Sequence, residues 1–255
     1  MANEIAKSEN SFSVTLTSKL DGITDALPKD FNKPRFVQNA LSLVNSKPEL
    51  VKDYGQAQVM AGLVRGAMLG LDFFNNECYL VGYGKTLNYQ TSYRGQQKLI
   101  RKYAINPVKN IYAEVVREGD TFDSGIEKNQ RYITFKPVPF NNKPMVGAFA
   151  VCEFENGDML IEIMNMDELN AVRNVSKMAN SGSWKSFPLE MYKKVVIRRL
   201  CKRIEIDFEN PEQKQIFEAD TDIETDPVEI RNKEVNESAN SVDFEFEDAE
   251  VRPIT

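Results

Sequence analysis

Residues 77–103 constrain the fold of this chain more than any other stretch, because their pattern changes from a two-residue to a helical period. Residues 78–83 and 86–91 alternate on either side of Gly84-Lys85, a pair that suits a tight turn. From Tyr93 the apolar side chains recur at helical spacing until Asn106-Pro107. The stretch therefore predicts a β-hairpin that leads directly into a short helix.

This predicted helix carries its charge on one side only. Its apolar face holds Gln96, Leu99, Ile100 and Tyr103. The opposite face, within an arc of about 100°, holds Arg94, Lys98, Arg101 and Lys102. Residues 93–102 contain no acid, whereas a merely solvated helix usually mixes both signs in i,i+4 pairs. A plain charged surface stays the alternative, but the pattern favours binding of a polyanion.

A second acid-free basic stretch covers residues 191–203, in a helix expected to begin at Pro188. Its apolar stripe is Val196, Ile197, Leu200 and Ile204, and its basic face is Lys194, Arg198 and Lys202. Lys193 projects on the apolar side, so we expect it to reach a carboxylate or a phosphate. We hypothesise that the two basic helices form the two walls of one groove.

The rest of the chain predicts an α+β fold, with helices packed on a small, mostly antiparallel sheet. Strands are expected over residues 110–118, 131–136, 146–154 and 159–164, joined mainly by short turns such as Asn156-Gly157. Helices are expected near residues 31–47, over 55–71, and from an N-cap at Asp167 to about Met178. Gly62, Gly66 and Gly70 share one helix face, which predicts close approach of a neighbouring element.

The charge distribution predicts three regions along the 255 residues. Residues 206–255 hold 16 acidic and 4 basic side chains, a net charge of −12, which leaves +6 on residues 1–205. We expect a flexible N-terminal arm over 1–30, a DNA-binding core over 31–210 and a disordered acidic tail over 211–255. A basic body with an acidic tail is typical of nucleic-acid-binding proteins, and a merely soluble tail on an ordinary domain is the alternative. The tail would compete with DNA for the basic face or recruit a partner.

Several classes of site are excluded or disfavoured by the sequence. The chain has no histidine, so it has no Ser-His, Cys-His or His-metal site. Its three cysteines, Cys78, Cys152 and Cys201, stand far apart, and no phosphate-binding G-x-x-x-x-G-K-[ST] motif occurs. We expect no cofactor and no resident metal. The absence of a signal-peptide pattern or a long apolar run predicts a soluble, cytoplasmic protein.

A Mg²⁺-dependent nuclease is the enzymatic alternative. Glu212 and Lys214 have the E-x-K spacing of some nuclease sites, and Glu118 and Asp120 flank Gly119 as a candidate carboxylate pair. The first pair lacks a hydrophobic strand to hold it, and a polar turn is the ordinary account of the second. The expectation is therefore a protein that is not an enzyme.

Exposed aromatic rings next to basic faces are typical of single-strand binding, since each base stacked on a ring contributes roughly 1–3 kcal/mol. The candidates for stacking are Tyr83, Tyr89, Tyr93, Tyr112 and Trp184. Core packing is the alternative for each of these rings.

Three segments, read in order, resemble the phage RecT family of single-strand annealing proteins. They are QTSYRGQQKLI from Gln90, IYAEVVREGDTF from Ile111, and WKSFPLEMYKKVVIRRL from Trp184. The resemblance extends over about residues 35–208. The chain departs from the family pattern at Met191-Tyr192-Lys193-Lys194, where a small residue usually replaces the tyrosine.

The resemblance implies a protein that binds single-stranded DNA without ATP and pairs it with a complementary strand in phage-type homologous recombination. It implies a homo-oligomer, either a ring or a helical filament, and an annealed duplex intermediate. It also implies a phage 5′–3′ exonuclease and a host single-strand-binding protein as partners, and no membrane. By position, the implied DNA contacts are Gln90, Tyr93, Arg94, Lys193, Lys194 and Arg198. A passive single-stranded-DNA-binding protein stays the main alternative.

Overall fold

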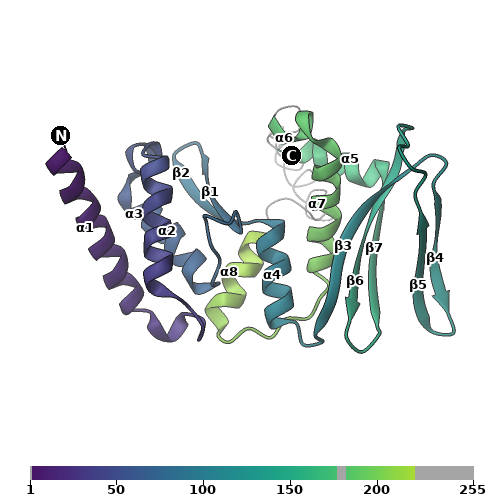
Figure 1. The fold of residues 1–255 in the computed structure, drawn as a ribbon, viewed down its shortest axis with the longest axis horizontal. Helices are drawn as coiled ribbons and strands as arrows, with labels where there is room; N and C mark the ends of the chain where they lie inside the picture. The colour runs from purple at the N-terminus through teal and green to yellow at the C-terminus, as the bar shows by residue number, and fades with distance from the viewer. Residues whose placement is uncertain (1, 177–181, 222–255) are drawn as a thin grey trace, which may run out of the picture. The chain divides into compact units, whose positions relative to one another are not determined.

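The computed structural model describes residues 2–176 and 182–221 of the chain, all within one compact unit, Met1–Thr225. In chain order the elements are α1 (Ala2–Asp21), a 3₁₀ turn (Thr24–Ala26), α2 (Lys33–Ser46), α3 (Glu49–Met68), β1 (Cys78–Tyr83), β2 (Thr86–Thr91), α4 (Tyr93–Tyr103), β3 (Val108–Arg117), β4 (Thr121–Glu127), β5 (Gln130–Lys136), β6 (Met145–Phe154), β7 (Met159–Asn165), α5 (Met166–Val175), α6 (Gly182–Ser186), α7 (Pro188–Cys201) and α8 (Pro211–Thr221). The α+β class predicted from the sequence is confirmed (Figure 1).

The strands pair antiparallel, as predicted, but in three small sheets instead of one. These are the β1–β2 hairpin, the sheet β3–β6–β7 and the β4–β5 hairpin. Strand β4 was not predicted, since its Asp123-Ser124-Gly125 centre lacks apolar alternation. Lys128 and Asn129 form its turn with φ of 50° and 65°, the backbone that tight two-residue hairpins need.

The first core corrects the prediction of a flexible N-terminal arm. Phe12, Leu16 and Leu20 of α1 are buried in it together with side chains of α2, α3, β2 and α4. These three residues recur every fourth position, so one stripe of a helix buries all of them. Val14, which lies between Phe12 and Leu16 in the sequence, is exposed on another side of the helix.

Helix α3 allows the hairpin to approach closely through its glycines. A Cβ at Gly62 would lie 2.4 Å from Leu80 Cδ2, and one at Gly66 would lie 2.6 Å from the Phe73 ring. The predicted close packing is confirmed for these two. Gly70 has a different role, because it lies just after α3 and its φ of +65° ends the helix.

The second core lies between the inner face of β3–β6–β7 and helices α5, α6 and α7. Helix α7 is buried on more sides than its pattern predicts, since Val195, Ile197 and Arg198 are all below a tenth exposed. Helix α5 begins from Asn165, not from Asp167 as predicted: the Asn165 side chain accepts from the Glu168 N–H, and the Glu168 side chain accepts in return.

A third core covers the opposite face of the same sheet. The β4–β5 hairpin folds over that face, and its Phe122 and Phe135 rings lie 5.2 Å and 5.1 Å from the ring of Phe149 in β6. The hairpin is therefore attached by aromatic packing instead of strand pairing.

Helix α4 joins the first two cores. Leu99 and Tyr103 are buried in the first and Ile100 in the second, which confirms the predicted apolar face of α4. Figure 1 shows α4 between the helices of the first core and the sheet. At its start, a Cβ at Gly95 would lie 2.1 Å from the Glu77 carbonyl oxygen, so only glycine fits there. The packing of α4 against both cores thus fixes the orientation of its exposed face.

Helix α8 corrects the predicted start of the tail. Gln213, fully buried, donates from Nε2 to the Met68 carbonyl at 2.8 Å and accepts from the Glu209 N–H at 3.1 Å. Phe217 is buried beside it in the first core. Residues 211–221 therefore belong to the folded unit, and the rest of the predicted tail, residues 222–255, lies outside the described residues.

Candidate nucleic-acid interface

The exposed side of α4 presents the predicted cations. Ser92 caps the helix by accepting from the Gly95 N–H at 3.1 Å. The α4 basic face, which comprises Arg94, Lys98, Arg101 and Lys102, is exposed along the whole helix. It lines an open hollow of about 510 Å³ together with Asn75, Glu77 and Gln97. Glu77 is the only acid in that lining, so the hollow is electropositive.

Two of these four cations are oriented by acids from other elements. Lys98 Nζ lies 2.7 Å from Glu77 Oε2 and donates to the Gly70 carbonyl at 3.1 Å. Lys102 pairs with Asp30, and its hydrogen bond lowers the pKa of that carboxyl. Burial acts to lower the pKa of Lys102, but the interactions with Asp30 and Tyr103 together outweigh it, so the pKa ends above its ordinary value. Both groups stay charged at neutral pH.

The other two cations are the ones most available to phosphate. Among the described residues, no carboxylate forms an ion pair with Arg94 or Arg101. The Arg94 Nε–H donates to Tyr93 Oη at 3.3 Å, and its guanidinium lies 5.9 Å from the centroid of that ring. Both arginines line the hollow, about two helical turns apart on α4.

Polar and aromatic groups gather at the start of α4. Gln90 lies opposite Tyr79 in the hairpin register, so both point away from the core-facing Tyr89 and Leu80. Tyr79 is 40% exposed. Burial raises its pKa, and the charge of Arg94 opposes that rise, which places the two side chains near each other. The structure thus brings Gln90 and Tyr79 to the N-terminal end of the α4 basic face.

Three basic side chains on or just after α7 pair with acids of the sheet. Lys193 Nζ lies 2.8 Å from Glu114 Oε2, which confirms its predicted reach for a carboxylate. Arg199 and Arg203 both pair with Glu162 of β7, at 2.7 Å and 2.6 Å. That carboxylate is only 7% exposed, so the two guanidinium groups supply the charge pairing that its burial requires.

The groove predicted between α4 and α7 is not present, because the two helices pack against each other. Ile100 of α4 packs in one core with Val196 and Leu200 of α7, so the helices touch instead of facing each other across a space. Arg198 is 6% exposed and Lys194 is half-buried. Lys202, also half-buried, lines a separate hollow of about 460 Å³ with side chains of α8.

The remaining aromatic candidates differ in exposure. Trp184 is 5% exposed, its ring lies 5.4 Å from that of Tyr192, and Arg173 lies over its face. Tyr89 is also buried, and Tyr112 packs edge-on against Phe149. Trp184 and Tyr89 are therefore occupied by protein neighbours, and the side chain of Tyr83 lies outside the described ones.

The sequence reasoning missed the loop between α3 and β1. Asp72 holds it, accepting from the Phe74 N–H at 2.8 Å and from Asn75 Nδ2 at 3.2 Å. Phe74 is 69% exposed while its neighbour Phe73 is buried. Two adjacent phenylalanines in a loop have no periodicity, so no local signal distinguishes the buried ring from the exposed one.

Among the residues considered for a nuclease, Asp120 anchors a turn. Asp120 accepts from the Arg117 and Val138 N–H groups and from Asn141 Nδ2, each at 2.9 Å. These bonds, that of Val138 first, lower the pKa of its carboxyl, as expected for a turn anchor. Lys214 lies on α8, 3.8 Å from Glu218.

Three further features concern the described residues alone. No three acidic or cysteine side chains in 2–176 and 182–221 gather closely enough to hold a metal ion. Burial raises the pKa of the Cys152 thiol to about 11 and also raises that of Cys201, which makes both poor nucleophiles. Within the same ranges, no helix has the length and apolar character needed to cross a membrane.

Comparison with known proteins gives two matches. The sequence model described as the RecT family matches residues 34–236. The chain is also 27% identical over 205 residues to Protein RecT of Escherichia coli (strain K12), an alignment that covers 75% of this chain and 74% of that protein. The matched region includes α4, the hairpin before it and α7.

Proposed function

The chain belongs to the RecT family, and from that premise we propose that it binds single-stranded DNA on the α4 basic face and anneals complementary strands without ATP. Membership of this family implies single-strand annealing in recombination. The particular surface, the independence of ATP and the assembly are our proposals. The absence of a phosphate-binding loop motif in the sequence supports a reaction that uses no nucleotide.

The observation that carries the proposal is the α4 basic face itself. Its four cations line one open hollow, and Arg94 and Arg101 have no acidic partner among the described residues. Phosphate contacts release condensed counterions, so they supply affinity that does not depend on base sequence. Annealing needs this chemistry, because two strands repel each other until their phosphates are neutralised.

The groups at the start of α4 suit the bases of the same strand. Tyr79 and Tyr93 offer partly exposed rings, and Gln90 offers an amide that can accept and donate. Stacking on such rings tolerates every base. We therefore propose phosphate contacts along α4 and base contacts at its beginning.

On α7, we propose supporting roles for the candidate residues Lys193, Lys194 and Arg198. Lys193 is already paired with Glu114, and Arg198 is buried. DNA reaches Lys193 only if Glu114 is displaced, and Arg198 only if a neighbouring element moves. We propose the same supporting role for Trp184 and Lys202, because neither of them lines the α4 hollow.

The assembly and the partners follow from family membership and are proposed with it. We propose a homo-oligomer, as a ring or a helical filament, that acts in the cytoplasm beside a phage 5′–3′ exonuclease and a host single-strand-binding protein. Light scattering with and without oligonucleotide tests the first part. A particle that remains a monomer in both conditions contradicts it.

One assay separates the proposed function from its alternatives. Two complementary oligonucleotides with a fluorophore and a quencher are mixed with the protein in the absence of ATP. Faster quenching than for the free strands is expected, whereas slower quenching indicates a passive coating protein. Incubation of end-labelled DNA with protein and Mg²⁺ tests the nuclease alternative, for which shortened strands would be the result.

A further inference from the structure

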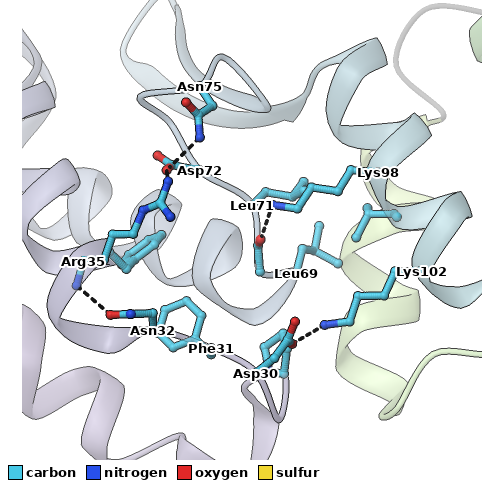
Figure 2. A pocket seen from close by; sticks show the side chains of 14 residues that line it. Asp30, Phe31, Asn32, Arg35, Leu69, Leu71, Asp72, Asn75, Lys98 and Lys102 are labelled. Carbon is cyan, nitrogen blue, oxygen red and sulfur yellow. Dashed lines mark hydrogen bonds and ion pairs between the residues drawn. The ribbon is translucent and has the colours of Figure 1, made fainter.

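A small cavity lies beside the α4 basic face and is distinct from the open hollow. It has a volume of about 190 Å³ and is bounded by α2 and the segment before it, by the loop that follows α3, and by α4. Figure 2 shows Arg35 on one side, Lys98 and Lys102 on the other, and Leu69 and Leu71 between them. The cavity therefore has charged walls and an apolar floor.

The floor of the cavity is apolar. Leu69, Leu71 and Leu99 at its base are each at most 2% exposed. The ring of Phe31 beside them is half-buried and lies 5.2 Å from that of Phe36, at an angle of 50°. A planar ring placed against the open side of Phe31 gains free energy by displacing water from it.

The rim supplies hydrogen-bonding groups for the edge of that ring. The Arg35 side chain is 66% exposed, and its guanidinium lies 3.8 Å from Asp72 Oδ2, beyond a hydrogen bond. Its donors and its flat face therefore stay available. Asn75 lies at the same rim with its amide anchored on Asp72.

The charge of the lining argues against a phosphate in the cavity. Its three cations face two carboxylates, and the nearest pairs are Lys102 with Asp30 and Arg35 with Asp72. A phosphate would meet both acids, whereas an uncharged ring would not. The volume is also below the roughly 300–1,000 Å³ of pockets for drug-sized ligands. One uncharged bicyclic or monocyclic ring fits these limits.

The cavity and the hollow share three residues. Asn75, Lys98 and Lys102 line both spaces. A strand with its phosphates on the α4 basic face thus has a base within reach of the cavity. We therefore expect the uncharged ring in the cavity to be a base of that strand.

We propose that the cavity receives one nucleobase of the bound single strand, with its face on the apolar floor and its edge at Arg35 and Asn75. The proposal rests on the proposed binding of single-stranded DNA to α4. A base held there contributes affinity that counterion release does not, so it persists at high salt. It is also withheld from the complementary strand until it leaves.

Photocrosslinking tests the location directly on the unmodified protein. A 5-iododeoxyuridine-substituted oligonucleotide is bound and irradiated, and the crosslinked peptides are identified by mass spectrometry. Crosslinks within residues 28–36 or 69–75 are expected. Crosslinks confined to other peptides overturn the base cavity while leaving the proposed function standing. Failure of the oligonucleotide to bind at all contradicts the proposed function first.

A matched pair of variants tests the energetic role. Arg35→Ala removes the rim group, and Lys47→Ala removes an exposed cation at the other end of α2. Arg35→Ala is expected to weaken binding of oligo-dT about tenfold and to leave binding of an abasic oligonucleotide unchanged, with Lys47→Ala altering neither. An equal loss on both oligonucleotides overturns the proposal, because it assigns Arg35 to phosphate.

Free thymidine separates the two sources of a base. Weak binding, at millimolar concentration, is expected for the nucleoside alone. Micromolar binding of free thymidine with no crosslink from the strand would make the cavity a site for a free nucleoside instead, and would overturn its assignment to DNA.

Discussion

Removal of the two cations without acidic partners should weaken DNA binding in a salt-dependent way. The change is Arg94→Ala together with Arg101→Ala, both exposed on α4. Each phosphate contact on a single strand contributes about 0.7 to the slope of log K against log salt. Loss of two contacts makes the slope shallower by about 1.4, which is about 25-fold weaker binding at roughly 0.1 M salt and little change near 1 M.

Fluorescence anisotropy of a labelled oligo-dT, titrated at several salt concentrations, measures this slope. The matched control is Arg131→Ala with Lys136→Ala, which removes the same charge from exposed positions on β5. Alanine is a good helix former, so the melting temperature of the α4 variant should stay near that of the parent. An unchanged slope, or an equal loss in the control, would refute the assignment of α4 as the phosphate-binding surface.

Three further predictions concern the supports of this surface. Gly95→Ala places a Cβ 2.1 Å from the Glu77 carbonyl oxygen and should cost about 1–3 kcal/mol of stability in urea unfolding; an unchanged midpoint would contradict the close contact. Leu16→Ala removes a fully buried side chain of α1 and should cost about 2–5 kcal/mol, whereas a flexible arm would lose nothing. DNA affinity should be flat between about pH 6 and 8, since the chain has no histidine. The Asp30–Lys102 pair also persists in this pH range. The pKa of Asp30 is lowered, so the stabilisation from its carboxylate is lost only as pH falls through that pKa. The pKa of Lys102 is raised, so the stabilisation from its ammonium group is lost only as pH rises through that pKa. A titration midpoint within this pH range, in a plot of DNA affinity against pH, would contradict the prediction of a flat profile.

Local patterns in the sequence were enough for the hairpin and α4. The turn at Gly84-Lys85, the capping serine at position 92 and the helical apolar stripe each depend on neighbours within about four residues. The buried and exposed faces of α4 came out as predicted for the same reason. The β6–β7 hairpin, with its Asn156-Gly157 turn, is a further example.

Elements with weak or mixed patterns were not recoverable in this way. Helix α1 has its apolar residues far apart in a polar context, and β4 has a polar centre. Helix α8 begins inside the acidic region, and its attachment depends on Gln213 reaching Met68, 145 residues away. Tertiary packing stabilises each of these segments, so local propensity alone understates them.

The sequence by itself determined that α4 and residues 191–203 carry cations without acids among them, and that pattern pointed to a polyanion. Only the tertiary structure decided which cations stay available. Glu114 and Glu162 come from distant strands to pair with cations of α7, whereas Arg94 and Arg101 on α4 meet no such acid among the described residues. The physical reason is that an ion pair depends on distance in space, and the helical period says which side a residue faces but not what is packed against that side.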